Sequence, residues 1–384
     1  MITITDKKKC SGCKACQNAC VTKAISFEED KDGFWYPFVN IEKCTQCGLC
    51  ERVCPYKRDD YGIPDDNKVY TQIFFAAQVK EHYILKRVSS GGAFQALAKV
   101  IIEKGGTVYG AVQENVDHIF HIRITTESEL KRTRKSKYFQ SDTNNSYSLV
   151  KKDLIDGRPV LFSGTGCQIA GLYCYLGKEY ANLYTCEVVC HGVPSRKIWE
   201  CYRNEKEERE GKKIVGLVFR DKSKGWSRNQ YKITYDDGTV EYERSTYQLF
   251  HAGYLQGFFY RPSCGSCPFA NLPRVADVTL GDFWNYKGEL NKKDLGVSLV
   301  AINNVNGLQL LKEAENYLFI EKTSKEDALE SCRHINHHPE ENPQKEEFIK
   351  KVFSNGYYVA ANKYIVISKS KTGIINRLKL FLRR

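Results

Sequence analysis

Apolar residues follow two alternating patterns over most of the chain. Between residues 94 and 101 they recur at helical spacing, which predicts a helix that ends at Gly105-Gly106. The apolar stretch at 107–112 then predicts a strand. The alternation continues downstream, with helices predicted at 147–155, from 167 onward and at 198–207, and strands at 159–162, at 183–189 and within 214–240. Strands that alternate with helices in this way favour an α/β domain with a mixed sheet.

The two ends of the chain depart from this alternation. Residues 26–40 contain aromatic and apolar stretches that predict short strands, and the charged segment 57–68, with glycine and proline, predicts a linker. The last residues form a basic amphipathic segment with apolar side chains toward one side, at Ile374, Ile375, Leu378, Phe381 and Leu382. Such a segment either packs on its own domain as a helix, or lies on an anionic membrane surface or a partner.

Composition is that of a soluble globular protein. The chain has 384 residues, 42% hydrophobic and 27% charged, and no apolar run approaches the ~20 residues that a membrane span needs. Its first residues lack the basic and apolar regions of a secretory signal, so we expect a cytoplasmic protein.

Sixteen cysteines are many for such a chain, and their clustering indicates metal rather than disulfides. One run recurs almost unchanged, first as Cys10-x2-Cys13-x2-Cys16-x3-Cys20 and then as Cys44-x2-Cys47-x2-Cys50-x3-Cys54-Pro55. This is the bacterial ferredoxin spacing, in which the fourth cysteine of each run ligates the other cluster. We therefore expect two [4Fe–4S] clusters, one on Cys10, Cys13, Cys16 and Cys54 and the other on Cys44, Cys47, Cys50 and Cys20. Zinc is the alternative, but zinc sites usually pair two C-x2-4-C hairpins across a long spacer.

The chain is therefore expected to have four parts. These are an α+β ferredoxin-like two-cluster domain at residues 1–60, a linker at 61–75, a larger α/β domain with a mixed sheet at 76–365, and the basic tail at 366–384. Two clusters of charge −2 each would lower the formal net charge from +12 to +8, so the basic excess is modest. We expect no nucleic acid partner from it.

Eight cysteines remain in the larger domain: Cys167, Cys174, Cys186, Cys190, Cys201, Cys264, Cys267 and Cys332. The pair Cys264-x2-Cys267 has the form of a metal hairpin but needs two more ligands. Cys167 and Cys190 each follow a predicted strand, where functional residues gather in α/β sheets. Spacing alone leaves two interpretations open, a third cluster on these four cysteines or buried free thiols.

Two glycine turns precede predicted helices. They are Ser89-Ser90-Gly91-Gly92 and Ser163-Gly164-Thr165-Gly166, and either places backbone N–H groups where a nucleotide phosphate would bind. A plain helix cap explains each turn equally well. Neither completes a G-x-G-x-x-G fingerprint with a downstream acid, so a nicotinamide Rossmann site is not supported.

These turns belong to a series of motifs whose order resembles that of coenzyme F420 hydrogenase and dehydrogenase beta subunits, in the longer form with an N-terminal two-cluster ferredoxin domain. The resemblance covers nearly the whole chain. Its motifs are Ser89-Ser90-Gly91-Gly92, Ser136-Lys137-Tyr138-Phe139-Gln140-Ser141, Gly164-Thr165-Gly166-Cys167-Gln168, Cys190-His191-Gly192-Val193-Pro194-Ser195, Phe219-Arg220-Asp221-Lys222 with Gly225-Trp226, Arg261-Pro262-Ser263-Cys264 with Cys267, and Leu280-Gly281-Asp282-Phe283-Trp284.

The resemblance implies an α/β domain that holds FAD and one further [4Fe–4S] cluster. The flavin-site candidates are then Ser89, Ser90, Gly91, Gly92, Lys137, Gln140, Gly164 and Thr165. The third cluster falls on Cys167, Cys190, Cys264 and Cys267. No catalytic residue is assigned.

The function expected on this basis is that of an FAD-dependent iron–sulfur oxidoreductase. Electrons would pass between a hydride carrier, a deazaflavin-like coenzyme or an unknown one, and a redox partner protein or substrate. Bacterial relatives of the longer form are associated with surface polysaccharide synthesis, which makes that pathway a candidate setting. The alternatives are a ferredoxin-type electron-transfer subunit without flavin chemistry and, from a different class, a zinc-stabilised protein that binds nucleic acid.

Overall fold

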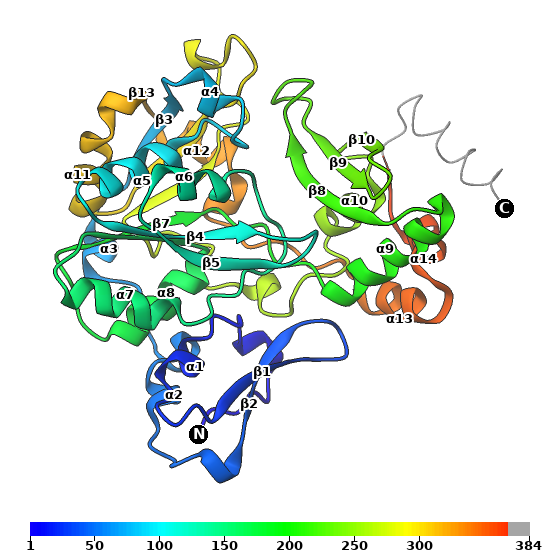
Figure 1. The fold of residues 1–384 in the computed structure, drawn as a ribbon, viewed down its shortest axis with the longest axis horizontal. Coiled ribbons are helices and arrows are strands. Elements are labelled where there is room, and N and C mark those ends of the chain that lie inside the picture. The colour runs from blue at the N-terminus through cyan, green and yellow to red at the C-terminus, as the bar shows by residue number, and fades with distance from the viewer. Residues whose placement is uncertain (368–384) are drawn as a thin grey trace.

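The computed structural model describes residues 1–367 as a small N-terminal unit, a large α/β body and a lobe beside it (Figure 1). The predicted basic tail lies outside these residues from position 368 onward. The strands are β1 (Ile25–Glu29), β2 (Trp35–Val39), β3 (Ile73–Val79), β4 (Thr107–Gln113), β5 (Ile119–Ile124), β6 (Val160–Gly164), β7 (Leu183–Val188), β8 (Ile214–Asp221), β9 (Gln230–Tyr235), β10 (Val240–Arg244), β11 (Val278–Asp282), β12 (Ser298–Ile302) and β13 (Leu318–Thr323).

The helices of the described residues are distributed over all three parts. They are α1 (Ala15–Ala19), α2 (Leu49–Arg52), α3 (Asp65–Val69), α4 (His82–Leu85), α5 (Ala93–Glu103), α6 (Glu127–Leu130), α7 (Ser146–Ile155), α8 (Gly166–Leu176), α9 (Arg196–Glu210), α10 (Leu249–Leu255), α11 (Val305–Glu313), α12 (Lys325–Ser331), α13 (Lys345–Asn355) and α14 (Tyr357–Tyr364). Every helix and strand predicted from apolar spacing is present. None of the helices in residues 1–367 combines the length and apolar character needed to cross a bilayer.

An eight-stranded mixed sheet forms the centre of the body, in the order β13-β3-β12-β11-β7-β6-β4-β5. Strands β4, β6, β7 and β11 run parallel, while β12 is antiparallel to both β11 and β3, so β3 points the same way as β11. Helices α5 and α11 cover one face, and α7 and α8 cover the other. The expected fold class, a ferredoxin-like unit followed by an α/β domain with a mixed sheet, is confirmed.

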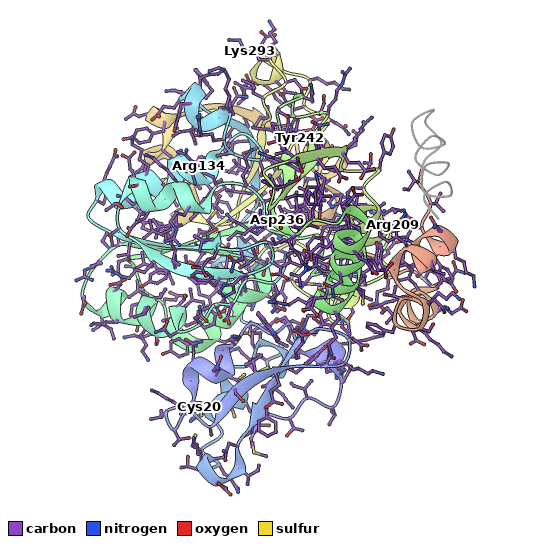
Figure 2. The ribbon with its side chains drawn as sticks, turned by 45° about the vertical axis from the view of Figure 1, so that its right-hand side comes forward. Cys20, Arg134, Arg209, Asp236, Tyr242 and Lys293 are labelled. Carbon is purple, nitrogen blue, oxygen red and sulfur yellow. The ribbon has the colours of Figure 1, made fainter. Side chains whose placement is uncertain are left out.

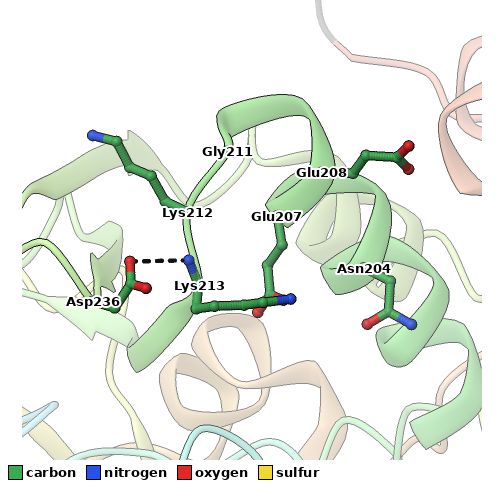
Figure 3. Close-up of a pocket in the computed structure, with 7 residues that line it drawn as sticks. All are labelled: Asn204, Glu207, Glu208, Gly211, Lys212, Lys213 and Asp236. Atoms are coloured by element: carbon green, nitrogen blue, oxygen red, sulfur yellow. Dashed lines mark hydrogen bonds and ion pairs between the residues drawn. The ribbon is translucent and has the colours of Figure 1, made fainter.

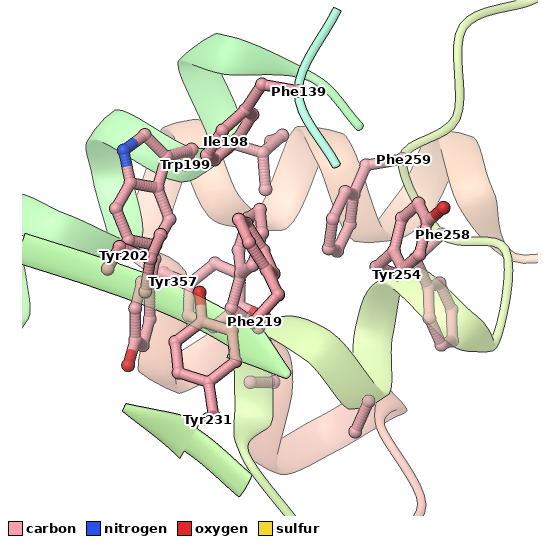
Figure 4. Close-up of a cluster of buried hydrophobic side chains, with 14 of the residues drawn as sticks. Phe139, Ile198, Trp199, Tyr202, Phe219, Tyr231, Tyr254, Phe258, Phe259 and Tyr357 are labelled. Carbon is pink, nitrogen blue, oxygen red and sulfur yellow. The ribbon is translucent and has the colours of Figure 1, made fainter. Parts of the chain in front are cut away.

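The strands predicted within 214–240 belong to a different sheet. Strands β8, β9 and β10 form a three-stranded antiparallel sheet in the lobe, where β9 and β10 meet at the turn around Gly238. This sheet packs with α9, α10, α13 and α14 around an aromatic core (Figure 4). Fully buried rings such as Trp199, Phe259 and Tyr357 fill that core, and apolar burial of this kind stabilises the lobe.

The segment expected as a linker is packed against the body. It contains α3 and the first residues of β3. The side chain of Asn67 is fully buried, and its amide donates to the carbonyl oxygens of Arg274 at 3.0 Å, Val275 at 2.9 Å and Ala276 at 3.1 Å. One polar side chain that satisfies three buried carbonyls ties the segment down despite its charged composition.

The N-terminal unit is held against the body by polar contacts. Lys14 Nζ pairs with Asp142 at 2.5 Å, the amide of Asn18 donates to the carbonyl oxygen of Asn144 at 2.8 Å, and Ser195 Oγ donates to that of Asp32 at 2.6 Å. Helix α1 packs against α8. The unit lies at one end of the molecule, with Cys20 far from Lys293 at the opposite end (Figure 2).

Candidate iron–sulfur and flavin sites

The first cysteine set gathers around the start of α1. Cys10, Cys13 and Cys16 come from the loop and the helix, and Cys54 precedes the short 3-10 turn Pro55–Lys57. Burial raises the pKa of the Cys16 thiol, and the neighbouring Cys10 and Cys54 thiols raise it further. The pKa of Cys13 is raised by burial and then by Cys16 and Cys54. The structure therefore brings together the four residues that the crossed pairing assigns to one cluster.

The second cysteine set lines one pocket at the outer end of the same unit. Its members are Cys20, Cys44, Cys47 and Cys50, and apolar residues close the walls. Backbone N–H groups point at two of the sulfurs, Ala24 N to Cys20 Sγ and Ile2 N to Cys50 Sγ, both at 3.2 Å. Cys47 is exposed, which places the edge of this set at the protein surface.

The thiols of the described residues do not converge on a single-metal site. Within residues 1–367, no three His, Cys, Asp or Glu side chains converge closely enough to hold one metal ion. A single zinc ion needs such convergence, because all four ligands bind one centre. In a [4Fe–4S] cluster each thiolate binds a different iron, so its four sulfurs stand farther apart.

The third cysteine set lies in the body. Cys167 stands in the first turn of α8, and Cys190 follows β7. Cys264 begins the 3-10 turn Cys264–Ser266, and Cys267 follows it. Burial raises the pKa of Cys190 to about 12, with the Cys264 and Cys167 thiols as further causes. The pKa of Cys267 is raised by burial and by the thiols of Cys167, Cys264 and Cys190. The four thiols are thus mutual neighbours, whereas spacing alone had left open whether they form one set or are separate buried thiols.

The first and third cysteine sets face each other across the junction of the unit and the body. Tyr147 Oη lies between two acceptors that share its single hydrogen, the carbonyl oxygens of Cys13 at 2.9 Å and Gln168 at 2.8 Å. Gly171 on α8 leaves space for the first set, because a Cβ there would lie 3.0 Å from Cys13 Sγ. The pKa of Tyr56, raised chiefly by burial, is also raised by thiols of both sets, and its ring packs on the same hydrophobic cluster as Cys13 and Cys167.

The flavin-site candidates do not form one cluster. Ser89 Oγ accepts from the backbone N–H of Ser136 at 2.8 Å, and Ser90 Oγ donates to the carbonyl oxygen of Val297 at 2.8 Å. Gly91 packs on the sheet, since a Cβ there would lie 2.2 Å from the carbonyl oxygen of Ala77. Gly92, at φ +84°, caps α5. Close packing and capping account for this turn without any ligand.

The remaining candidates divide between two places. Burial lowers the pKa of Lys137 to about 7, and its Nζ donates to the carbonyl oxygen of Thr133 at 2.6 Å. Gln140 turns toward the ferredoxin loop, where its amide donates to the carbonyl oxygens of Ser11 and Gly12 at 3.0 and 3.1 Å. Gly164 ends β6, and Thr165 caps α8, with its Oγ1 3.2 Å from Cys167 Sγ.

Several motif residues to which the sequence assigned no role gather beside the Ser89–Gly92 turn. Lys222 Nζ donates to the carbonyl oxygen of Ser90 at 3.1 Å. Arg220 pairs with Asp282, and its guanidinium lies 4.8 Å from the centre of the Trp284 ring. Trp284 also stacks on Trp226, with ring centres 4.5 Å apart and planes 7° from parallel. The shared order of the motifs was the only sequence signal for this arrangement.

Sheet geometry explains why these motifs meet. The parallel strands β3, β6, β7 and β11 all end at the same edge, and the two glycine turns, Cys167, Cys190 and Trp284 follow those ends, while Cys264 and Cys267 come before β11. Ligands of open α/β sheets bind outside the carboxyl ends of the strands.

By contrast, the surface pocket of about 220 Å³ at the end of α9 contains none of the cysteines (Figure 3). Its charged side chains pair with one another, Lys213 Nζ with Glu207 at 2.8 Å.

A buried histidine at this edge predicts a pH-dependent stability. His121 Nε2 donates to the carbonyl oxygen of Ser163 at 2.9 Å, so its Nδ1, 2.8 Å away from Ser141 Oγ, accepts. Burial lowers the pKa of His121 from 6.5 to about 4. The unfolded state therefore binds a proton that the folded state does not, and stability falls as pH drops below 6.5. We expect a loss of about 1.5 kcal/mol between pH 6.5 and pH 5 from this residue.

The measurement is the free energy of unfolding of wild type and His121→Gln at both pH values. The variant should lose less stability on acidification than wild type, because the unfolded Gln takes up no proton. Equal pH dependence in the two proteins would contradict the assignment of the proton to His121.

Two family models match the chain. The model for a 4Fe-4S dicluster domain matches residues 9–58, and that for the C-terminal part of the coenzyme F420 hydrogenase/dehydrogenase beta subunit matches residues 157–328. The paired cysteine runs and this match define an iron–sulfur electron-transfer protein. The chain thus combines an N-terminal 4Fe-4S dicluster domain with a region that matches the C-terminal part of the coenzyme F420 hydrogenase/dehydrogenase beta subunit.

Two individual proteins are similar to parts of the chain. An uncharacterized ferredoxin of Methanocaldococcus jannaschii is 33% identical over 52 residues, which are 14% of this chain and 66% of that ferredoxin. The match thus spans slightly less than two thirds of the ferredoxin's length. A structure of the F420-reducing [NiFe] hydrogenase complex from Methanosarcina barkeri matches with a TM-score of 0.46 and 16% identity, over 74% of this chain and 93% of that one.

Proposed function

We propose that the protein is an iron–sulfur flavoprotein oxidoreductase with three [4Fe–4S] clusters and one FAD. The observation that carries this proposal is the junction of the two parts, where the third cysteine set faces the first. The Cys167 thiol is near enough to Cys13 to raise the pKa of that thiol, and a Cβ on Gly171 of the same helix would lie 3.0 Å from Cys13 Sγ. Clusters on the second, first and third sets would then form a relay from the surface to the carboxyl edge of the sheet.

We place the flavin at that edge, between the Ser89–Gly92 turn and the face of Trp284. Trp284 is 43% exposed, so the part of its ring that Trp226 and Arg220 leave uncovered offers an apolar surface to a planar ligand. The N-terminus of α5, an eleven-residue helix, begins directly after the turn and would favour a phosphate. Gln140 contributes to the ferredoxin junction in this arrangement rather than to the flavin, which revises its proposed role.

Bound FAD would exchange electron pairs with a hydride carrier and single electrons with clusters. The chain's own part is to hold these groups in sequence and to keep the inner two cysteine sets away from water. Because Cys47 is exposed, we place the docking site of a redox partner protein at the second cysteine set. The proposal includes a hydride carrier, either a deazaflavin-like coenzyme or an unknown one, and a link to polysaccharide synthesis. It also includes a cytoplasmic location, where free thiols stay reduced.

One observation favours a second candidate function, electron transfer without flavin chemistry. The hydroxyl groups of Ser89 and Ser90 already have hydrogen-bond partners within the chain, and Gly91 is required by packing. A turn that is satisfied in this way needs no ligand to explain it. In that case the body would serve as a scaffold that positions the clusters for a partner.

Metal and flavin analysis of protein purified without oxygen decides between the two. The flavoprotein proposal predicts about twelve irons with matching acid-labile sulfide, no zinc, and one FAD per chain. About eight irons without flavin would support the scaffold function instead. Zinc in place of iron would overturn both.

A further inference from the structure

Arg261 is a fully buried cation at the junction between the first and third cysteine sets. Its side chain has no exposed surface. Its guanidinium donates from Nε to the carbonyl oxygen of Cys10 and from Nη2 to that of Trp35, both at 2.8 Å, and from Nη1 to Gln140 Oε1 at 3.2 Å. Nη2 also lies 3.7 Å from Cys10 Sγ.

None of these acceptors is a carboxylate, which distinguishes Arg261 from other buried arginines of the described chain. Arg274 pairs with Glu187, and Arg220 pairs with Asp282. A buried lysine without a carboxylate can lose its proton, but a guanidinium stays charged. An isolated charge inside a protein is costly unless an anion compensates it.

The loop of the first cysteine set is shaped around this guanidinium. Gly12 lies between Cys10 and Cys13 with φ +70°, a conformation that favours glycine. A Cβ on Gly12 would lie 3.1 Å from Arg261 Nη1 and 3.3 Å from Cζ. On the other side, the ring centre of Tyr36 lies 4.5 Å from Cζ, an additional cation–π contact.

A cluster on Cys10, Cys13, Cys16 and Cys54 would supply the missing anion. A [4Fe–4S] core of charge +2 with four thiolates carries −2, and one-electron reduction makes it −3. A fixed positive charge stabilises the reduced form more than the oxidised form, because Coulomb attraction grows with the charge of the partner. We propose that Arg261 is the charge partner of the first ferredoxin cluster and raises its reduction potential relative to that of the second.

This role has a consequence for the relay. Arg261 also adjoins the third cysteine set, because it stands three residues before Cys264, whose backbone N–H donates to the carbonyl oxygen of Arg261 at 2.9 Å. One guanidinium would therefore favour an electron at the two inner positions over the exposed second cluster. The inference rests on the proposed positions of the clusters and adds the residue that sets their order.

The test compares Arg261→Gln and Arg261→Lys with wild type in anaerobic redox titrations followed by electron paramagnetic resonance. In Arg261→Gln, the reduction equilibrium of the first cluster should shift at least tenfold toward the oxidised form, a fall of at least 59 mV for one electron. The second cluster should stay unchanged and serves as the control within the same molecule. Arg261→Lys keeps the positive charge, so the reduction potential of its first cluster should stay close to that of wild type.

Ligand replacement identifies the signals. Cys47→Ser alters an exposed ligand of the second cluster, so the signal that it changes belongs to that cluster. Iron content is measured in every sample. If Arg261→Gln loses the first cluster and Arg261→Lys retains it, the positive charge is needed to hold a cluster of charge −2. That result supports the proposal.

Two outcomes would overturn it. In the first, both variants retain their iron and have wild-type potentials. In the second, both lose the first cluster equally, which would mean that the hydrogen bonds of the guanidinium, and not its charge, hold the cluster. Failure of the broader proposed function looks different, because it appears in wild type itself as missing iron or flavin.

Discussion

Replacing Cys54 by alanine should remove about half of the cubane content of the N-terminal unit. Cys54 lies beside Cys13 and Cys16, not at the pocket of the second cysteine set, so its loss opens a corner of the first cluster. Iron, acid-labile sulfide and the paramagnetic signal of the reduced protein measure the loss. Cys201→Ala is the matched control, since the half-buried Cys201 belongs to none of the three cysteine sets.

Double variants separate crossed from uncrossed ligation. In the crossed arrangement, Cys10→Ala with Cys54→Ala damages one cluster, so the second remains intact. Cys44→Ala with Cys54→Ala damages both and should leave the N-terminal unit without an intact cubane. The opposite ranking of the two double variants would show that each run holds its own cluster.

Arg274→Gln should destabilise the protein by about 3 to 5 kcal/mol, because it leaves the buried carboxylate of Glu187 without its partner. Arg274 and Glu187 are 2% and 0% exposed. Thr279 Oγ1 donates to Glu187 Oε1 at 3.0 Å, but one neutral hydroxyl cannot balance a buried charge. The midpoint of chemical unfolding under anaerobic conditions measures the loss.

Two controls accompany this measurement. The double variant Arg274→Gln with Glu187→Gln removes both charges and should recover much of the lost stability. Lys292→Gln breaks an exposed ion pair with Glu289 and should change stability by less than about 1 kcal/mol. If Arg274→Gln behaved like Lys292→Gln, the buried pair would contribute little.

Local patterns in the sequence predicted the features that depend on residues close together along the chain. Cysteine intervals predicted two sets of four cysteines, because ferredoxin ligands lie on tight loops, and the assignment of these sets as cluster ligands stays a prediction. Apolar periodicity predicted the helices and strands of the body. The contacts that join the parts could not be predicted in this way. Arg261 contacts Cys10 across 251 residues, and nothing near either residue indicates the contact.

The lobe illustrates the same limit. Strands β8, β9 and β10 were predicted as strands, but local pattern does not say which sheet a strand joins. Likewise, the polar and charged composition of 61–75 predicted a linker, whereas the buried Asn67 finds three carbonyl partners more than two hundred residues away. Gln140, assigned by resemblance to the flavin site, contacts the ferredoxin loop, a contact that its local sequence does not indicate.

The polar contacts that hold the N-terminal unit bear on how such a protein could have been assembled and could be re-engineered. Lys14, Asn18 and Asp32 all contact the body from positions between or beside the ferredoxin ligands. A ferredoxin transplanted from another protein would bring the cysteine spacing but not these contacts. The unit is therefore not an interchangeable cassette, and a functional graft would have to carry its docking residues along with its ligands.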